Sequence, residues 1–186
     1  MGAMDFLKAG LKNIRTTGTI TRSSAFLCRK VIEHIDFANA RILVELGAGD
    51  GVITRHILAA MHPEAKLLAF EILPDLYEKL SGIEDERLIA VQDSAEKIGA
   101  YLEKNGFGNA DYMVSALPFA AFADELTDRI LTEAYANLKT GGQYSQIQYS
   151  TVTKKLYEKY FGKMRVNYTL LNIPPAFVFI SQPKEN

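Results

Sequence analysis

The stretch Val44-Glu45-Leu46-Gly47-Ala48-Gly49-Asp50-Gly51 decides the fold. It ends a mostly apolar run that begins at Arg41, and a helical pattern over 52–61 follows it. Glycine lets a backbone turn sharply and approach a ligand closely, and the start of a helix presents unpaired N–H groups. The stretch therefore predicts a buried strand, a tight loop that faces a ligand, and a helix. A plain strand–helix turn without a ligand is the alternative.

Strand and helix patterns alternate along the rest of the chain. We predict strands over 66–71, 87–92, 110–115 and 143–149, followed in turn by helices over 74–80, 95–104, 124–138 and 152–161. Gly141-Gly142 are expected to close the helix over 124–138. Two final strands, 164–171 and 176–181, have no helix between them, which implies an antiparallel pair at one edge. Repeated strand–helix units indicate an α/β domain with a mostly parallel sheet and helices on both faces.

Residues 1–40 form a separate N-terminal extension in this interpretation, and 41–186 form the domain. Helical spacing of apolar residues predicts helices over 4–15 and 25–35. Thr16 to Ser24 is expected to be a polar turn between them.

Acidic residues stand where the first three strands end. Ligands of such sheets bind beyond the carboxyl ends of the strands. Glu45 precedes the glycines, where it would repel a pyrophosphate but suit a cationic amino-acid group. Glu71 is placed to accept hydrogen bonds from both hydroxyls of a ribose, unless it is simply an exposed strand-end residue. Asp93 is placed to accept a hydrogen bond from an adenine amine, and it is also a good N-cap for the helix from Ala95.

These three motifs, at these spacings, resemble the S-adenosylmethionine site of the Rossmann-like (class I) methyltransferases. The resemblance covers 41–181 and implies a seven-stranded sheet whose last strand is antiparallel. It also implies that S-adenosylmethionine is the cofactor. The residues that it places against the cofactor are Thr21, Ser23, Ser24, Glu45, Gly47, Ala48, Gly49, Gly51, Glu71, Ile72, Asp93, Ser94 and Ser115.

Four further segments, 17–24, 115–119, 146–150 and 173–178, are similar to the bacterial phospholipid N-methyltransferases. They are less closely similar to the ribosomal RNA adenine dimethyltransferases. The RNA enzymes carry Asn or Asp ahead of the Pro-aromatic element, and here that position is Ala116. Alanine accepts no side-chain hydrogen bond, which argues against a nucleobase as the acceptor. The resemblance to the phospholipid enzymes implies a phosphatidylethanolamine-type amine instead. The alternatives are an RNA adenine N-methyltransferase and a protein that binds the cofactor without catalysis.

The acceptor site is expected at Leu117, Pro118, Phe119 and Tyr149. Pro118 and Phe119 would wall the site, while the backbone carbonyls of Ala116 and Leu117 orient the amine. An aromatic face beside a sulfonium or ammonium is stabilising, which suggests a role for Phe119 and Tyr149. Plain packing under a loop is the alternative for both rings.

Composition bounds the remaining possibilities. Of the 186 residues, 48% are hydrophobic and 23% are charged, which is typical of a globular protein rather than a disordered chain. A single cysteine, a charged N-terminal start and the lack of an apolar run of about 18 residues favour the cytoplasm. His34, His56 and His62 lack metal-ligand spacing, so no metal site is expected.

Charge is uneven along the chain, because basic residues are in excess over 1–30 and 151–186, and acidic residues over 31–150. A basic amphipathic helix over 4–15 is expected to lie on an anionic membrane. A helix packed on the core, with solvated basic faces, is the alternative. The location predicted is therefore peripheral, at the inner membrane surface, with a phospholipid headgroup as substrate. Nucleic acid is not expected as a partner, and the sequence gives no indication of the oligomeric state.

Overall fold

The computed structural model describes residues 24–169 and 175–185. The predicted helix over 4–15, and Thr21 and Ser23 in the polar turn, lie outside the described residues. Within the described ranges, no helix is long and apolar enough to cross a membrane.

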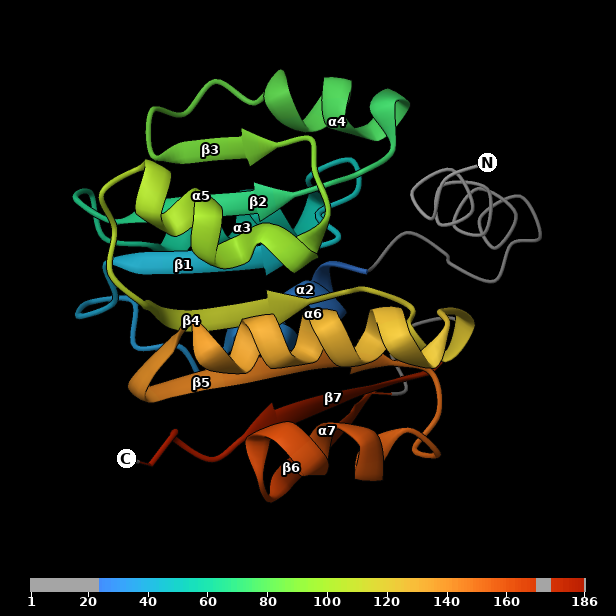
Figure 1. Cartoon of the computed structure of the whole chain (residues 1–186). Helices are drawn as coiled ribbons and strands as arrows, with labels where there is room; N and C mark the ends of the chain where they lie inside the picture. The colour runs from blue at the N-terminus through green and yellow to red at the C-terminus, as the bar shows by residue number, and fades with distance from the viewer. Residues whose placement is uncertain (1–23, 170–174, 186) are drawn as a thin grey trace.

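The described strands form a seven-stranded sheet in the order β3-β2-β1-β4-β5-β7-β6 (Figure 1). β7 runs antiparallel to both of its neighbours, whereas the pairs among β1 to β5 are parallel. This confirms the predicted Rossmann-like α/β sheet with an antiparallel last strand. The strands are β1 (Ile42–Leu46), β2 (Lys66–Phe70), β3 (Leu88–Val91), β4 (Ala110–Ser115), β5 (Leu138–Gln148), β6 (Met164–Thr169) and β7 (Ala176–Ser181).

Helices cover both faces of the sheet, with α5, α6 and α7 on the face toward the viewer in Figure 1 and α2 and α3 behind it. Alternate residues of the buried strands supply the two cores, because successive side chains of a strand point to opposite faces. Val44 and Leu46 pack in one cluster with α5 and α6, while Leu43 packs in the other with α2 and α3. The helices are α2 (Ala25–Ile32), α3 (Val52–Ala60), α4 (Pro74–Ser81), α5 (Ile98–Lys104), α6 (Asp124–Ala136) and α7 (Lys154–Phe161).

The boundary between α6 and β5 differs from the prediction. α6 ends at Ala136, and β5 already begins at Leu138, which pairs with Ala110 of β4. Gly141-Gly142 therefore lie inside the strand and do not close the helix. The C-terminal segment holds them there, because Gly141 N–H donates to the Lys184 carbonyl and Lys184 N–H donates to the Gly142 carbonyl.

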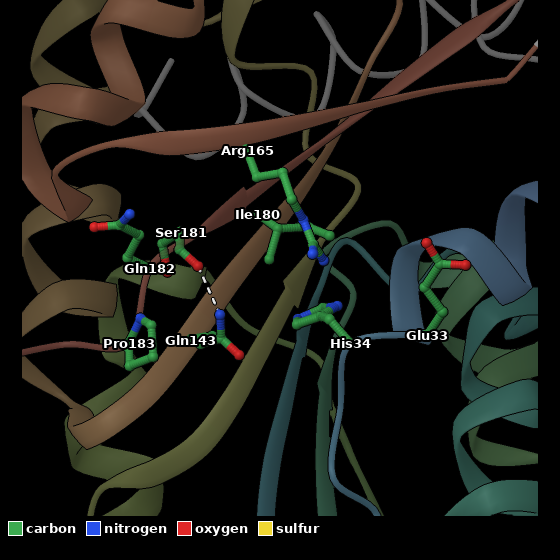
Figure 2. A pocket seen from close by; sticks show the side chains of 8 residues that line it. All are labelled: Glu33, His34, Gln143, Arg165, Ile180, Ser181, Gln182 and Pro183. Atoms are coloured by element: carbon green, nitrogen blue, oxygen red, sulfur yellow. Dashed lines mark hydrogen bonds between the residues drawn. The ribbon is translucent and has the colours of Figure 1, made fainter.

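A cavity of about 630 Å³ lies between the end of α2 and strands β5, β6 and β7 (Figure 2). None of the predicted site residues lines it. His34 is one of the residues that line this cavity. Its ring lies edge-on to the ring of Tyr112, with the two ring centroids 5.9 Å apart. Burial lowers the pKa of His34 to about 4, the positive charge of Arg165 acts in the same direction, and Glu33 opposes it.

We expect His34 to make stability depend on pH. The unfolded chain binds the histidine proton near pH 6.5 and the folded chain only near pH 4, so stability falls as the pH is lowered across that window. The full shift corresponds to about 3 kcal/mol. Denaturant unfolding of the wild type and of His34→Phe at pH 4, 5, 6 and 7 checks this. The carboxylates titrate in both proteins, so the difference between the two curves isolates His34. Parallel curves would contradict the prediction.

Candidate cofactor and acceptor site

The glycine loop between β1 and α3 depends on backbone conformations that favour glycine. Gly47, Gly49 and Gly51 have φ angles of 76°, 62° and 82°, in the left-handed region where other residues are strained. The Phe70 carbonyl at the end of β2 accepts hydrogen bonds from Gly47 N–H and Ala48 N–H, both at 2.9 Å. The loop is therefore fixed to the neighbouring strand.

Glu71 lies directly against this loop. Its Oε2 accepts from Gly49 N–H at 2.9 Å and its Oε1 accepts from Leu73 N–H at 2.8 Å. Glu71 is buried, as is Ile72 beside it, so it is not the exposed strand-end residue of the alternative interpretation. The carboxylate joins the glycine loop to the start of α4. The contact with a ribose stays a prediction.

Glu45 is an almost fully buried carboxyl group under the loop. Its Oε2 accepts from Thr54 Oγ1 at 2.6 Å, while Oε1 has no partner among the residues that the structure describes. Burial raises the pKa of Glu45 to about 8; the charge of Glu71 adds to this, and the hydrogen bond from Thr54 opposes it. The group is therefore mostly protonated at pH 7, and loss of its proton leaves a carboxylate oxygen without a partner among the described residues. Such an oxygen suits the cationic amino-acid end of S-adenosylmethionine, so the residues present fit that cofactor.

Asp93 follows β3, the next strand along the edge, where Glu71 N–H donates to the Val91 carbonyl at 3.0 Å. Its carboxylate accepts from Ser94 N–H, Lys97 Nζ and Tyr101 Oη. Burial alone would raise the pKa of Asp93, but these hydrogen bonds and the charge of Lys97 lower it. The carboxylate therefore stays ionised at the end of the strand, and its contact with adenine stays a prediction.

The N-cap prediction for Asp93 is wrong. Ser94 caps the 3₁₀ turn Ala95–Lys97 (η1) that precedes α5, and its Oγ accepts from Glu96 N–H. Asp93 stands one residue too early, and its side chain turns to Lys97 and Tyr101 instead.

The turn after β4 meets the glycine loop. Ala116 N–H donates to the Leu46 carbonyl at 2.9 Å, which continues the pairing of β1 with β4. A Cβ atom added to Gly47 would lie 2.8 Å from Leu117 Cδ2. Ser115 is fully buried below this turn, and its Oγ accepts from Leu117 N–H at 3.3 Å. The predicted cofactor loop and the predicted acceptor turn thus touch.

The two predicted aromatic residues lie on opposite faces of the sheet. Phe119 is buried, with its ring edge-on to Phe122 and Tyr157. Tyr149 packs partly buried against the cluster that contains α2. These positions favour the packing interpretation for Phe119. A contact of either ring with a cation stays a prediction.

The structure thus brings the predicted residues at the ends of β3, β2, β1, β4 and β5 to one edge of the sheet. Ser24 is the N-cap of α2, and its Oγ accepts from Leu27 N–H. Sequence reasoning missed Thr54, Lys97 and Tyr101, which hydrogen-bond to the predicted acids. The contact of Thr54 with Glu45 could have been predicted, because the first turn of a helix after a short loop lies close to the end of the preceding strand.

Comparisons with known proteins support the class that this site suggests. No family model matches the chain. The ornithine lipid N-methyltransferase of Singulisphaera acidiphila is 29% identical over 174 residues, which cover 92% of this chain and 91% of that protein.

Solved structures show the same fold. A ribosomal RNA methylase from Streptococcus thermophilus has a TM-score of 0.64 at 19% identity, covering 89% of this chain and 99% of that one. The 1,6-didemethyltoxoflavin-N1-methyltransferase of Burkholderia thailandensis, solved with S-adenosylhomocysteine, has a TM-score of 0.69 at 13% identity, covering 100% of this chain and 92% of that one. A 16S rRNA N2 G1207 methyltransferase from T. thermophilus, solved with AdoMet and guanosine, has a TM-score of 0.65 at 20% identity, covering 89% of this chain and 44% of that one.

The fold, the loop with its buried acids and these likenesses define a Rossmann-like methyltransferase. The chain is a methyltransferase of this class, and the residues of its glycine loop fit S-adenosylmethionine.

We expect the contact between Gly47 and Leu117 to appear as thermodynamic coupling. Gly47→Ala suffers both backbone strain, about 1–2 kcal/mol, and the clash with Leu117 Cδ2. Gly49→Ala suffers the strain alone, because nothing lies within 4 Å of its added Cβ. Urea unfolding should therefore show the larger loss of stability for Gly47→Ala, and Leu117→Ala should relieve part of that loss in the double variant. Equal losses for the two alanine variants, or strict additivity with Leu117→Ala, would contradict the contact.

Proposed function

We propose that this methyltransferase transfers methyl groups to the amine of a membrane lipid, with the phosphatidylethanolamine type and the ornithine type as the candidate headgroups. The observation that carries the proposal is the match, over nearly the whole chain, to a protein named as a lipid-amine methyltransferase. Ala116 supports it, because this position of the turn has no side chain that could hold the amine of a nucleobase.

The reaction is an in-line displacement. When bound, S-adenosylmethionine supplies an activated methyl group whose carrier sulfur leaves as a neutral thioether. The neutral amine gives its lone pair to the methyl carbon, the electrons of the broken C–S bond stay on sulfur, and the proton lost by the nitrogen passes to water. Positioning accounts for most of the catalysis in such a step.

The chain supplies that positioning from two sides. On one side, Glu45, the glycine loop and Glu71 form the cofactor cradle, in which Gly49 N–H is fixed by Glu71. On the other side, Leu117 and Pro118 wall the acceptor site. The close approach of Leu117 to Gly47 sets the distance between the two halves of the site.

A membrane lipid requires the enzyme to work at a bilayer surface. We propose that the enzyme is peripheral at the inner, anionic surface of the membrane. The basic residues over 1–30 supply the attraction, because each Lys or Arg near such a surface contributes about 1 kcal/mol. The headgroup then reaches the turn at 115–119 without extraction of the lipid.

Radiolabelled methyl transfer into vesicles tests the proposed function. Purified enzyme is mixed with methyl-labelled S-adenosylmethionine and with phosphatidylglycerol vesicles that contain phosphatidylethanolamine, ornithine lipid or neither. We expect label in the organic phase with at least one of the two amines and none with phosphatidylglycerol alone. Gly49→Val should abolish it, because a β-branched residue is strained at a φ of 62°. Gly108→Ala is the matched control, because nothing lies within 4 Å of its added Cβ.

The failure of this assay is also informative. A preparation that binds S-adenosylmethionine but labels neither lipid would overturn the lipid proposal. Label in ribosomal RNA under the same conditions would then establish the RNA alternative.

Cofactor binding is expected to release a proton from Glu45. A carboxyl group with a pKa of about 8 is mostly protonated at pH 7, and a cation placed beside it favours the ionised form. Titration calorimetry in buffers of different ionisation enthalpy should show more protons released by the wild type than by Glu45→Gln. Any proton lost by the cofactor itself is common to both proteins and cancels. Equal proton release would show that Glu45 does not ionise on binding.

A further inference from the structure

A row of buried polar side chains runs along β5. Tyr144, Gln146 and Gln148 are at most 7% exposed, and their alternate positions place them on the face of the strand that packs against Phe119 and α7. A strand covered on both faces usually carries apolar residues there, and buried polar groups persist where they are hydrogen-bonded. The row therefore calls for an explanation that core packing does not provide.

The hydrogen bonds of Gln146 link this row to the acceptor turn. Its Oε1 accepts from Tyr144 Oη at 2.6 Å. Its Nε2 donates to the Leu117 carbonyl at 3.0 Å and to the Ile147 carbonyl at 2.8 Å. Both N–H groups of the amide and its oxygen are thus used, which fixes the orientation of the side chain.

The Leu117 carbonyl is fully engaged as a result. It accepts from Phe119 N–H at 3.0 Å as well as from Gln146, and a carbonyl oxygen has two lone pairs. Its two observed hydrogen bonds therefore leave no lone pair for the role predicted for this carbonyl, which was to orient the amine. Ala116 presents the neighbouring carbonyl, and among residues 24–169 and 175–185 no donor pairs with it.

We propose that Gln146 is a positioning residue for methyl transfer: it holds the Leu117 carbonyl inward, so that the Ala116 carbonyl is the acceptor that the turn offers to an N–H of the substrate amine. This inference rests on the proposed function, because it places the substrate amine at this turn. One hydrogen bond to Ala116 leaves the nitrogen lone pair free to point at the methyl group.

Two variants separate positioning from folding. Gln146→Met has a similar length and removes all three hydrogen bonds. Gln146→Glu keeps an acceptor for Tyr144, but in its ionised form it sets an oxygen against the Leu117 carbonyl. When that buried carboxyl is protonated, its O–H can donate to Leu117 again, and burial raises the pKa of such a group. Gln143→Met is the matched control, because Gln143 lies on the same strand and donates to the Ser181 carbonyl, away from the turn.

The first measurement is amide hydrogen exchange, which needs no substrate. Exchange of Phe119 N–H, which donates to Leu117, should speed up about tenfold or more in Gln146→Met and stay unchanged in Gln143→Met. A tenfold change corresponds to about 1.4 kcal/mol in the local opening equilibrium. Unchanged exchange at Phe119 would overturn the proposal, whatever the substrate proves to be.

The second measurement is turnover with the lipid that the wild type methylates. For Gln146→Met we expect kcat to fall about tenfold to a hundredfold, with KM for the lipid and Kd for S-adenosylmethionine nearly unchanged. Gln146→Glu should regain activity as the pH falls, whereas Gln146→Met should not. A wild-type kcat in a folded Gln146→Met protein, or equal losses in kcat and cofactor affinity, would overturn the positioning role. Failure of the wild type to label any lipid counts instead against the proposed function. The exchange result does not depend on that outcome, because it is measured without substrate.

Discussion

The hydrogen bond from Gly49 N–H to Glu71 is the constraint on which the site depends. It binds the loop, whose glycines have left-handed backbone conformations, to the residue that follows β2. The carbonyl of Phe70, the last residue of β2, accepts two further hydrogen bonds from the same loop. Because Gly47 then lies against Leu117, the position of the loop also determines where the acceptor turn can lie. Cofactor and acceptor are therefore placed by one connected set of backbone contacts, and the sheet supplies the rigid support beneath them.

Much of this arrangement could be predicted from the sequence, because it follows from local patterns. The apolar runs predict the strands, and the glycine spacing predicts the loop. Because the strands are parallel, Glu71, Asp93 and the turn at 115–119 are expected at the same edge of the sheet, where the strands end. The structure confirms the sheet and its antiparallel last strand. The class of enzyme followed from the resemblance to the Rossmann-like methyltransferases that those same residues carry.

The errors arise where distant contacts decide the outcome. Gly141-Gly142 has the local signature of a helix end, but pairing with the C-terminal segment around Lys184 draws both glycines into β5. Asp93 and Ser94 are both good caps, and the choice between them depends on Lys97 and Tyr101, which draw the aspartate aside. The bonding of Gln146 was equally hidden, because a glutamine in a strand gives no local sign of whether it is buried or solvated.

The antiparallel insertion of β7 has a consequence for how the molecule behaves in a crowded solution. It makes β6 the outer strand on one side, while the four-residue β3 is the outer strand on the other. An open strand edge invites another chain to add to the sheet, and short or charged edges discourage this. β6 carries Arg165 and Asn167 along its exposed length, and Asn167 is hydrogen-bonded back to Glu33 of its own chain. The short β3 is thus the poorer template, whereas β6 also exposes Val166 and Tyr168 and is the edge more open to another chain.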